Sequence, residues 1–339
     1  MNNIDWKNLG FDYLPTNINV RAYYKDGAWS ELEYTSDEYI KMHMATTCLH
    51  YGLEAFEGLK AFRGVDGKVR LFRVDENGRR LQSSARKLCL PELPLDMFVK
   101  ACYEVVKQNI DFVPPYESGA SLYLRPVLIG TKVGIGVKAS HEAMFFVFCS
   151  PVGPYFKGGM KPIKVIIDRV QDRAAPRGTG DIKAGGNYAS SIFSGEKAHT
   201  MGYSNVMYLD ATEHKYIEEC GAANFFGIKD GKYITPKSPS ILPSITNKSL
   251  RTLAEDMGLQ VEERPVPVEE LASFEEAGAC GTAAVISPIG YVFDIDTEEK
   301  ITYGDGNQVG PTCLKLYNAL QDIQYGRAED KFGWTIEII

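Results

Sequence analysis

The sequence predicts a two-domain protein of the α+β or α/β class, with a small N-terminal α+β domain and a larger C-terminal domain. Its 339 residues exceed what one hydrophobic core usually organises, and about 150 residues per domain gives two. Strand and helix patterns alternate in both halves, and the composition, 44% hydrophobic and 24% charged, is that of a globular protein. We therefore expect two domains with a cleft between them.

The N-terminal domain, expected over residues 1–150, shows strand patterns interleaved with two helices. Leu81, Ala85 and Leu88 recur at helical spacing, and such an apolar stripe must bury against a sheet. The expected strands are Val20–Tyr24, Val69–Phe72, Ser121–Ile129 and Ala143–Cys149, and the expected helices are Asn77–Leu88 and Pro94–Asn109.

A segment rich in proline and glycine, Cys149–Gly159, separates the two halves. These residues favour an ordered but irregular connection, so we expect the interdomain connection at residues 151–161. A connection between two domains is well placed to line a cleft, which puts Tyr155 toward a ligand.

The larger domain, expected over residues 162–339, again alternates strands and helices. Asp230 and Gly231 favour the positive φ angles of a tight hairpin turn between strands at 224–228 and 233–235. Thr246 is the expected N-cap of a helix that ends before Gly258. The other expected strands are Ile163–Asp168, Val206–Leu209 and Gln260–Glu263, and the expected helices are Asn187–Met201, Thr246–Met257 and Gly310–Gln324.

Charge, cysteine and histidine patterns exclude several classes of protein. The net charge of -7 and the lack of a basic run disfavour nucleic acid as a partner. The beginning MNNIDWKNLG does not resemble a signal peptide, and no apolar stretch approaches 18 residues. Seven cysteines without a CxxC pair indicate free thiols, and five histidines without ligand spacing give no support for a metal site. We expect a cytoplasmic protein that does not cross a membrane.

Lys183 is the first candidate for chemistry. It stands in DIKAGGNYASS, where an irregular stretch rich in Gly and Pro gives way to a helix. An ordinary lysine titrates near 10.4, whereas a lysine held in a cleft can form a Schiff base with an aldehyde cofactor. A lone Lys-x-Gly-Gly is more often a solvated loop lysine, so other segments must support this interpretation.

Glu219 and a helix N-terminus supply that support. Glu219 stands at a strand end in YIEECGAANFFGI, where small residues let a backbone approach a ligand. A buried carboxylate needs a partner, and a protonated pyridine nitrogen would be one, although Glu218 and Glu219 also fit an ordinary surface pair. Ile245 and Thr246 begin a helix whose N-terminal amides favour an anion such as phosphate, and simple capping by Thr246 is the alternative.

Three further segments look like ligand walls. HYGLEAFEGLKAFRG carries Tyr51 and Phe56 among glycines, and SLYLRPVLIG places Tyr123 and Arg125 on one face of a strand. Arg125 is able to clamp a carboxylate with its guanidinium, although a strand arginine is as often part of a surface salt bridge. The third segment, Gly281-Thr282-Ala283, is a small-residue turn whose amides suit a carboxylate or phosphate oxygen.

In this order the segments resemble those of the branched-chain aminotransferases, pyridoxal-phosphate enzymes of fold type IV, the fold of D-amino-acid aminotransferase. The similarity runs over nearly the whole chain, and so many collinear motifs are not expected by chance. They are HYGLEAFEGLKAFRG, LFR followed by Arg80, LYLRPVLIG, PVGPYF, KAGGNY, EECGAAN, LPSIT, GTAA and IQYG.

The resemblance implies a role for each matching residue. Lys183 would be the Schiff-base lysine, Glu219 would hold the pyridine nitrogen of pyridoxal 5'-phosphate, and Tyr188 would bond its 3'-oxygen. Leu242 would pack against the ring, and Arg125 would bind the glutamate carboxylate. The implied phosphate-binding residues are Arg80, Ile245, Thr246 and Thr282. The implied substrate-pocket residues are Tyr51, Phe56, Tyr123, Tyr155 and Ala283.

The implied activity is reversible transfer of the amino group of L-leucine, L-isoleucine or L-valine to 2-oxoglutarate, in a ping-pong reaction of a homodimer. D-amino-acid aminotransferases and aminodeoxychorismate lyases share the fold, but Tyr123-x-Arg125 and EGLKAFRG favour the branched-chain enzymes. A non-catalytic binding protein is disfavoured because the lysine, tyrosine, glutamate and arginine are all present. Ala284 and Ser287 replace the CxxC pair of mammalian relatives, while Cys220 and Ala223 depart from the pattern without removing a catalytic role.

Overall fold

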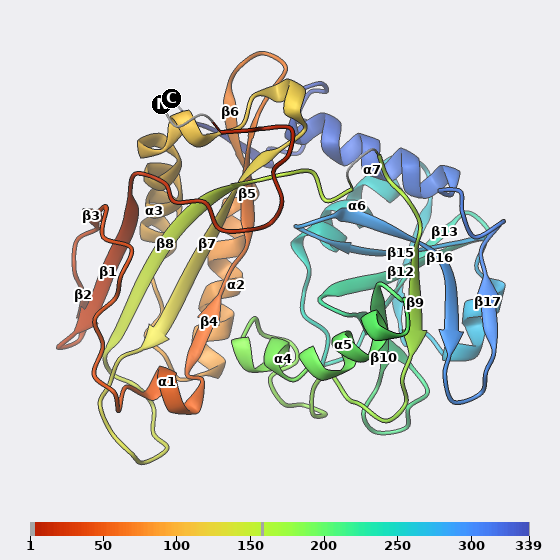
Figure 1. The fold of residues 1–339 in the computed structure, drawn as a ribbon, viewed down its shortest axis with the longest axis horizontal. Coiled ribbons are helices and arrows are strands. Elements are labelled where there is room, and N and C mark those ends of the chain that lie inside the picture. Colours follow the sequence, from red (N-terminus) through yellow and green to blue (C-terminus); the bar gives the residue numbers. More distant parts are fainter. Residues whose placement is uncertain (1–3, 157–158, 339) are drawn as a thin grey trace. The chain divides into compact units, whose positions relative to one another are not determined.

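The computed structural model describes residues 4–156 and 159–338, which form two compact units (Figure 1). Of these, residues 4–155, 182–185 and 322–338 belong to the first unit, and the remainder to the second. This division differs from the expected domains of 1–150 and 162–339, because the C-terminal strand β18 (Thr335–Ile338) pairs with β6 (Val69–Phe72) of the first unit. Residues 1–3, 157, 158 and 339 of the expected domains and connection lie outside the described residues.

The first unit is built on one sheet with the strand order β18-β6-β5-β7-β8-β1-β2, to which β3 and β4 are added at β1 and β7. The remaining strands are β1 (Asn19–Lys25), β2 (Ala28–Trp29), β3 (Glu33–Thr35), β4 (Glu54–Phe56), β5 (Leu59–Arg63), β7 (Ser121–Gly130) and β8 (Ala143–Val152). The helices are α1 (Thr47–Tyr51), α2 (Val74–Lys87) and α3 (Leu95–Gln108), with short 3-10 turns at Ile110–Phe112 and Tyr116–Ser118.

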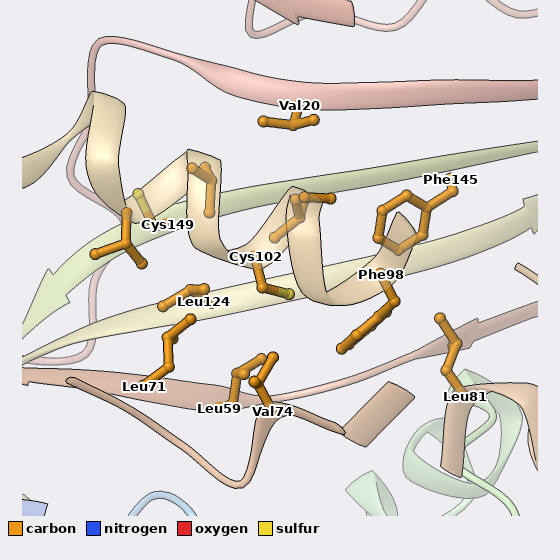
Figure 2. Close-up of a cluster of buried hydrophobic side chains, with 14 of the residues drawn as sticks. Val20, Leu59, Leu71, Val74, Leu81, Phe98, Cys102, Leu124, Phe145 and Cys149 are labelled. Carbon is orange, nitrogen blue, oxygen red and sulfur yellow. The ribbon is translucent and has the colours of Figure 1, made fainter. Parts of the chain in front are cut away.

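The core of the first unit lies between the sheet and helices α2 and α3. Leu81 and Phe98 from the helices pack with Leu124 and Phe145 from the strands, as Figure 2 shows. Successive side chains of a strand point to opposite faces. Because Leu124 faces this core, its neighbours in β7 face the other side of the sheet, where the candidate site lies.

The second unit contains a closed barrel. Its strand order is β11-β10-β9-β16-β15-β12-β13-β14, with β17 added at β16, and β11 also pairs with β12, so that six strands form a ring. The strands are β9 (Ile163–Ile167), β10 (Asn205–Leu209), β11 (Ile217–Cys220), β12 (Ala223–Lys229), β13 (Lys232–Pro236), β14 (Gln260–Arg264), β15 (Glu276–Gly281), β16 (Val285–Asp294) and β17 (Lys300–Thr302).

Helices α5 (Ile192–Thr200), α6 (Ile245–Asp256) and α7 (Pro311–Gln324) complete the fold, with α4 (Gly185–Ala189) and a 3-10 turn at Val268–Ser273. The predicted helix Asn187–Met201 is wrong as one element, because Ser190 and Ser191 bond backbone carbonyls with their hydroxyls and interrupt it. The predicted cap Thr246 is also wrong. Ser244 is the N-cap of α6, and its Oγ accepts the Asn247 N–H at 3.2 Å.

The predicted hairpin is confirmed, with positive φ at both Asp230 and Gly231. No helix in the described part of the chain is long and apolar enough to cross a membrane. Within the same residues there is no group of three or more His, Cys, Asp or Glu side chains that is arranged to hold a metal ion.

Candidate active site

Lys183 is held in the first unit as part of a short extended segment beside β4. Its carbonyl accepts the Phe56 N–H at 3.0 Å, its own N–H donates to the Ser84 Oγ at 3.1 Å, and Ala184 pairs with Ala55. The backbone of Lys183 is therefore fixed on both sides. Its half-buried side chain places Nζ 4.6 Å from the centroid of the Phe56 ring.

Arg125 lies beside the same ring. Its guanidinium carbon is 5.0 Å from the Phe56 centroid and 5.3 Å from that of Tyr123, and its Nη2 donates to the Tyr123 hydroxyl at 3.3 Å. The prediction that Tyr123 and Arg125 share a strand face is therefore confirmed. The Nε of Arg125 is buried and has no hydrogen-bond partner among the described residues. A buried donor of this kind is suited to a carboxylate ligand.

Lys60 adds a third cation to this face of the sheet. It stands opposite Tyr123 in the pairing of β5 with β7, and its Nζ lies 5.9 Å from the centroid of the Phe11 ring. Burial lowers the pKa of Lys60 to about 8. Phe11 also contacts both Tyr123 and Tyr155 edge to face, with centroids 6.2 Å apart in each case. Cations and aromatic rings together make a surface that suits an acid with an apolar chain.

Arg80 is oriented by a buried carboxylate. Its Nε and Nη2 each donate at 2.8 Å to the two oxygens of Glu57, which is fully buried and also accepts from Asn77 at 2.7 Å. Such a two-point contact fixes the plane of the guanidinium. The expected phosphate ligand is thus held rigidly in α2 by an acid in the connection between β4 and β5.

Glu219 is the central acid of the second unit. Only 2% of its surface is exposed, and its Oε1 accepts the Leu242 N–H at 2.7 Å. The Nη2 of buried Arg173 lies 3.5 Å from the same oxygen and donates to the carbonyls of Gly180 and Ser240. These contacts hold the carboxylate in one orientation.

Strand pairing places the small-residue turn at the level of Glu219. Glu219 pairs with Asn224 in β12, and Asn224 pairs with Cys280 in β15. Thr282 and Ala283 follow within two to three residues of Cys280, in the half-buried turn that joins β15 to β16. The barrel register therefore brings the end of β11 and this turn to the same end of the barrel.

The N-terminus of α6 offers amide donors in the second unit. Ile245 and Thr246 are its first residues, 8% and 7% exposed, and within the described residues neither N–H has a hydrogen-bond acceptor. Asn247 bonds Asn224 at 3.2 Å, and Asn224 donates to the Leu242 carbonyl at 3.1 Å. This network ties the helix start to Leu242 and the strand beside Glu219. Two buried amides at a helix N-terminus are donors suited to an anion such as phosphate.

The two remaining expected site residues make other contacts. Tyr188 lies in α4, where its carbonyl accepts from the N–H and Oγ of Ser191. The hydroxyl of Tyr51, at the end of α1, donates to the Ile135 carbonyl, and its ring lies against His50. Tyr51 is 44% exposed. The structure therefore does not join Tyr51 to Phe56 and Arg125 by a hydrogen bond or ring contact within the described residues.

Sequence reasoning missed Glu57, Lys60 and Arg173. Glu57 and Lys60 stand inside HYGLEAFEGLKAFRG, but only the three-dimensional structure shows that Glu57 meets Arg80 and that Lys60 lies opposite Tyr123. A buried helix arginine such as Arg80 needs a counter-ion, and that requirement was the available signal for Glu57. Arg173 stands in the irregular stretch DRAAPRGTGD, where no periodicity indicates burial.

Comparison with known proteins identifies the family. A family model described as amino-transferase class IV matches residues 54–291, more than half of the chain. The chain is 48% identical to the branched-chain-amino-acid aminotransferase of Haemophilus influenzae over 100% of both chains. It is also 48% identical to the Helicobacter pylori enzyme of the same name, over 100% of this chain and 99% of the relative. The chain belongs to the class IV aminotransferases.

Solved structures agree with this assignment. The crystal structure of the Escherichia coli branched-chain amino acid aminotransferase matches with a TM-score of 0.81 at 30% identity, over 96% of this chain and 100% of the other. That of the T.th. branched-chain amino acid aminotransferase with pyridoxamine 5'-phosphate matches with a TM-score of 0.79 at 25% identity, over 94% and 98%. The predicted fold type IV is therefore confirmed, and the cofactor is pyridoxal 5'-phosphate.

The residues present suit this cofactor by the chemistry of their donors and acceptors. A phosphate group needs amide or guanidinium donors, which Ile245, Thr246 and Arg80 provide. A ring nitrogen that carries a proton needs a buried acid, which Glu219 provides. An aldehyde needs an amine, which Lys183 provides.

Proposed function

We propose that this enzyme exchanges amino groups between the L-forms of leucine, isoleucine or valine and 2-oxoglutarate, giving the branched 2-oxo acid and L-glutamate. The observation that carries this proposal is the placement of Arg125 and Lys183 against the Phe56 ring, which combines a carboxylate clamp, an amine and an apolar wall. The relatives at 48% identity are named for this activity.

The residues that hold the cofactor follow from the same proposal. Lys183 would attach it covalently, Glu219 would pair with its ring nitrogen, Tyr188 would bond its 3'-oxygen, and Leu242 would pack against the ring. Arg80, Ile245, Thr246 and Thr282 would bind its phosphate. When bound, pyridoxal 5'-phosphate supplies an electron sink for the bond broken at the substrate α-carbon.

Proton transfer is then the task of Lys183. With the cofactor bound, the Lys183 amino group would act as the general base that takes the α-proton of the amino acid. The backbone bonds of Lys183 to Phe56 and Ser84 keep the amine in place during the two half-reactions.

One pocket must accept both an apolar chain and a carboxylate. Phe56, Tyr123 and Tyr155 supply apolar ring surface for the branched chain, with Tyr51 and Ala283 as further proposed walls. Arg125 supplies the donor for the distal carboxylate of glutamate and 2-oxoglutarate, through its buried Nε. The two kinds of substrate therefore depend on different atoms of the same pocket.

Replacement of Arg125 by Gln tests this division. We expect KM for 2-oxoglutarate and L-glutamate to rise about 10- to 100-fold, because a charge-assisted hydrogen bond is lost, while KM for L-leucine changes less than about threefold. Steady-state kinetics with each substrate varied measures the effect. Arg70→Gln, at a half-buried ion pair with Asp66 in the same sheet, is the matched control. An equal loss for both substrate classes contradicts the assigned role of Arg125.

We further propose that the enzyme is a cytoplasmic homodimer. An exposed apolar surface on the first unit supports the dimer. The 131–137 segment forms it together with α1 and the segment before α1, to which it is joined by a hydrogen bond from the Gly134 N–H to the Ala45 carbonyl. Its exposed residues are Met44, Leu49, Tyr51, Val133, Ile135 and Val137. Light scattering of the purified protein is expected to give twice the chain mass, and Ile135→Asp to reduce that mass. A wild-type mass of one chain contradicts the dimer.

The cysteines support the proposed cytoplasmic location. Seven free thiols, five of them buried, suit a reducing compartment.

A further inference from the structure

Glu54 is a half-buried acid on the face of the sheet that carries Arg125. It is the first residue of β4, where it pairs with Ile129 while Phe56 pairs with Val127. Residues two apart in a strand share a face, so the side chains of Glu54, Phe56 and Arg125 lie on the same side. Glu54 therefore stands one step along the strand from the ring that Arg125 and Lys183 contact.

Gly185 holds the carboxylate of Glu54 in place. Its N–H donates to Glu54, and a Cβ at Gly185 would collide with the Glu54 Oε1. The absence of a side chain at Gly185 lets the carboxylate lie directly against this backbone. Since Gly185 follows Lys183 by two residues, Glu54 is built into the segment that carries the reactive lysine.

Glu54 and Arg125 influence each other without a direct ion pair. The pKa of Glu54 is raised, chiefly by burial, while the Gly185 amide and the positive charge of Arg125 oppose that shift. The described residues include no ion pair between Glu54 and Arg125, and the Arg125 Nε has no acceptor among them. The arginine thus keeps a donor for a ligand while a fixed negative charge stands nearby.

We propose that Glu54 is a specificity-determining residue that balances the affinities for the two substrate classes. It is the counter-charge of Arg125 when an apolar chain is bound, and it repels the second carboxylate when a dicarboxylate is bound. The inference rests on the proposed function. A buried guanidinium with no anion nearby is costly, so Glu54 favours leucine. A dicarboxylate brings its own anion, and Glu54 then opposes it as a like charge. Neither substrate is held so tightly that it blocks the other.

Glu54→Gln removes the charge and keeps the shape, and its amide oxygen can still accept the Gly185 N–H. We expect the holoenzyme variant to bind glutarate about fivefold more tightly and 4-methylpentanoate about twofold more weakly. Calorimetric titration with these two unreactive acids measures binding without turnover. Glu142→Gln, at the exposed pair with Lys132, is the matched control and is expected to change neither affinity.

A double variant shows whether Glu54 acts through Arg125. In the Arg125→Gln background, Glu54→Gln is expected to lose most of its fivefold effect on glutarate, because the two charges interact. Unchanged or weaker glutarate binding by Glu54→Gln overturns the inference, as does equal tightening of both acids. If the unaltered holoenzyme bound neither acid but did transaminate leucine, the proposed function would stand and this inference would be wrong.

Discussion

Lys183→Ala is expected to abolish turnover, with kcat at least about 10⁴-fold lower, and to remove the visible absorbance of the cofactor attached to the protein. The Nζ of Lys183 lies 4.6 Å from the Phe56 ring, beside the proposed substrate clamp Arg125. The alanine variant therefore loses both the covalent attachment and the base that moves the α-proton. Kinetics with L-leucine and 2-oxoglutarate, together with an absorbance spectrum, measure the two losses.

The control for this variant is Lys132→Ala, which removes an exposed lysine paired with Glu142 in the same unit. Its spectrum and turnover are expected to match those of the unaltered enzyme. Retained turnover in Lys183→Ala, above a few per cent of the original rate, overturns the assignment of Lys183. Free cofactor and a primary amine added to the variant are expected to restore a small fraction of the activity.

Glu219→Gln is expected to lower kcat about 100- to 1,000-fold while the protein still binds the cofactor. The buried carboxylate of Glu219 is held by the Leu242 N–H and by Arg173, and we propose that it is the acid that pairs with the ring nitrogen. Glutamine retains the acceptor for Leu242 and loses the charge. Single-turnover kinetics with α-deuterated L-leucine is expected to show that proton transfer has become the slow step.

Glu218→Gln is the matched control, because Glu218 is the adjacent buried acid of β11 and bonds Ser238 at 2.7 Å. Its kcat is expected to stay within about threefold of the original value. Thermal melting of both variants checks that the buried Arg173 tolerates the loss of its partner charge. Unchanged turnover in Glu219→Gln would show that another acid serves the ring nitrogen.

Much of the fold could be predicted because its elements carry local signals. The strand Val69–Phe72 was predicted with its observed bounds, and Asp230-Gly231 identified the hairpin by turn chemistry alone. Helix α3 differs from its prediction by one residue at each end. Periodicity and turn residues act over a few positions, so a single sequence records them directly.

Features that depend on distant partners could not be predicted. The return of β18 to β6 joins residues more than 260 positions apart, and nothing in the C-terminal residues indicates that neighbour. The break between α4 and α5 arises from Ser190 and Ser191, whose hydroxyls bond backbone carbonyls. Serine also occurs on solvent-facing positions of intact helices, so the sequence does not indicate the break. The helix cap at Ser244 rather than Thr246 lies within the usual uncertainty of element boundaries.

The sequence predicted the residues of the candidate site, but it did not predict the ion pairs that hold them in place. Strand alternation was enough to place Tyr123 and Arg125 on one face, and the contact of Arg125 with Tyr123 confirms it. The ion pairs of Arg80 with Glu57 and of Arg173 with Glu219 needed the three-dimensional fold, because their partners lie 23 and 46 positions away with no fixed spacing. The specific roles assigned to these residues stay proposals.

The most direct test of the central claim is an absorbance spectrum of the purified enzyme between about 300 and 500 nm, recorded before and after addition of L-leucine or, in a separate cuvette, D-alanine. The account predicts a visible band from the cofactor held by Lys183 that L-leucine depletes and D-alanine leaves unchanged. A band that responds only to D-alanine, or no band after added cofactor, would contradict a branched-chain L-amino acid aminotransferase.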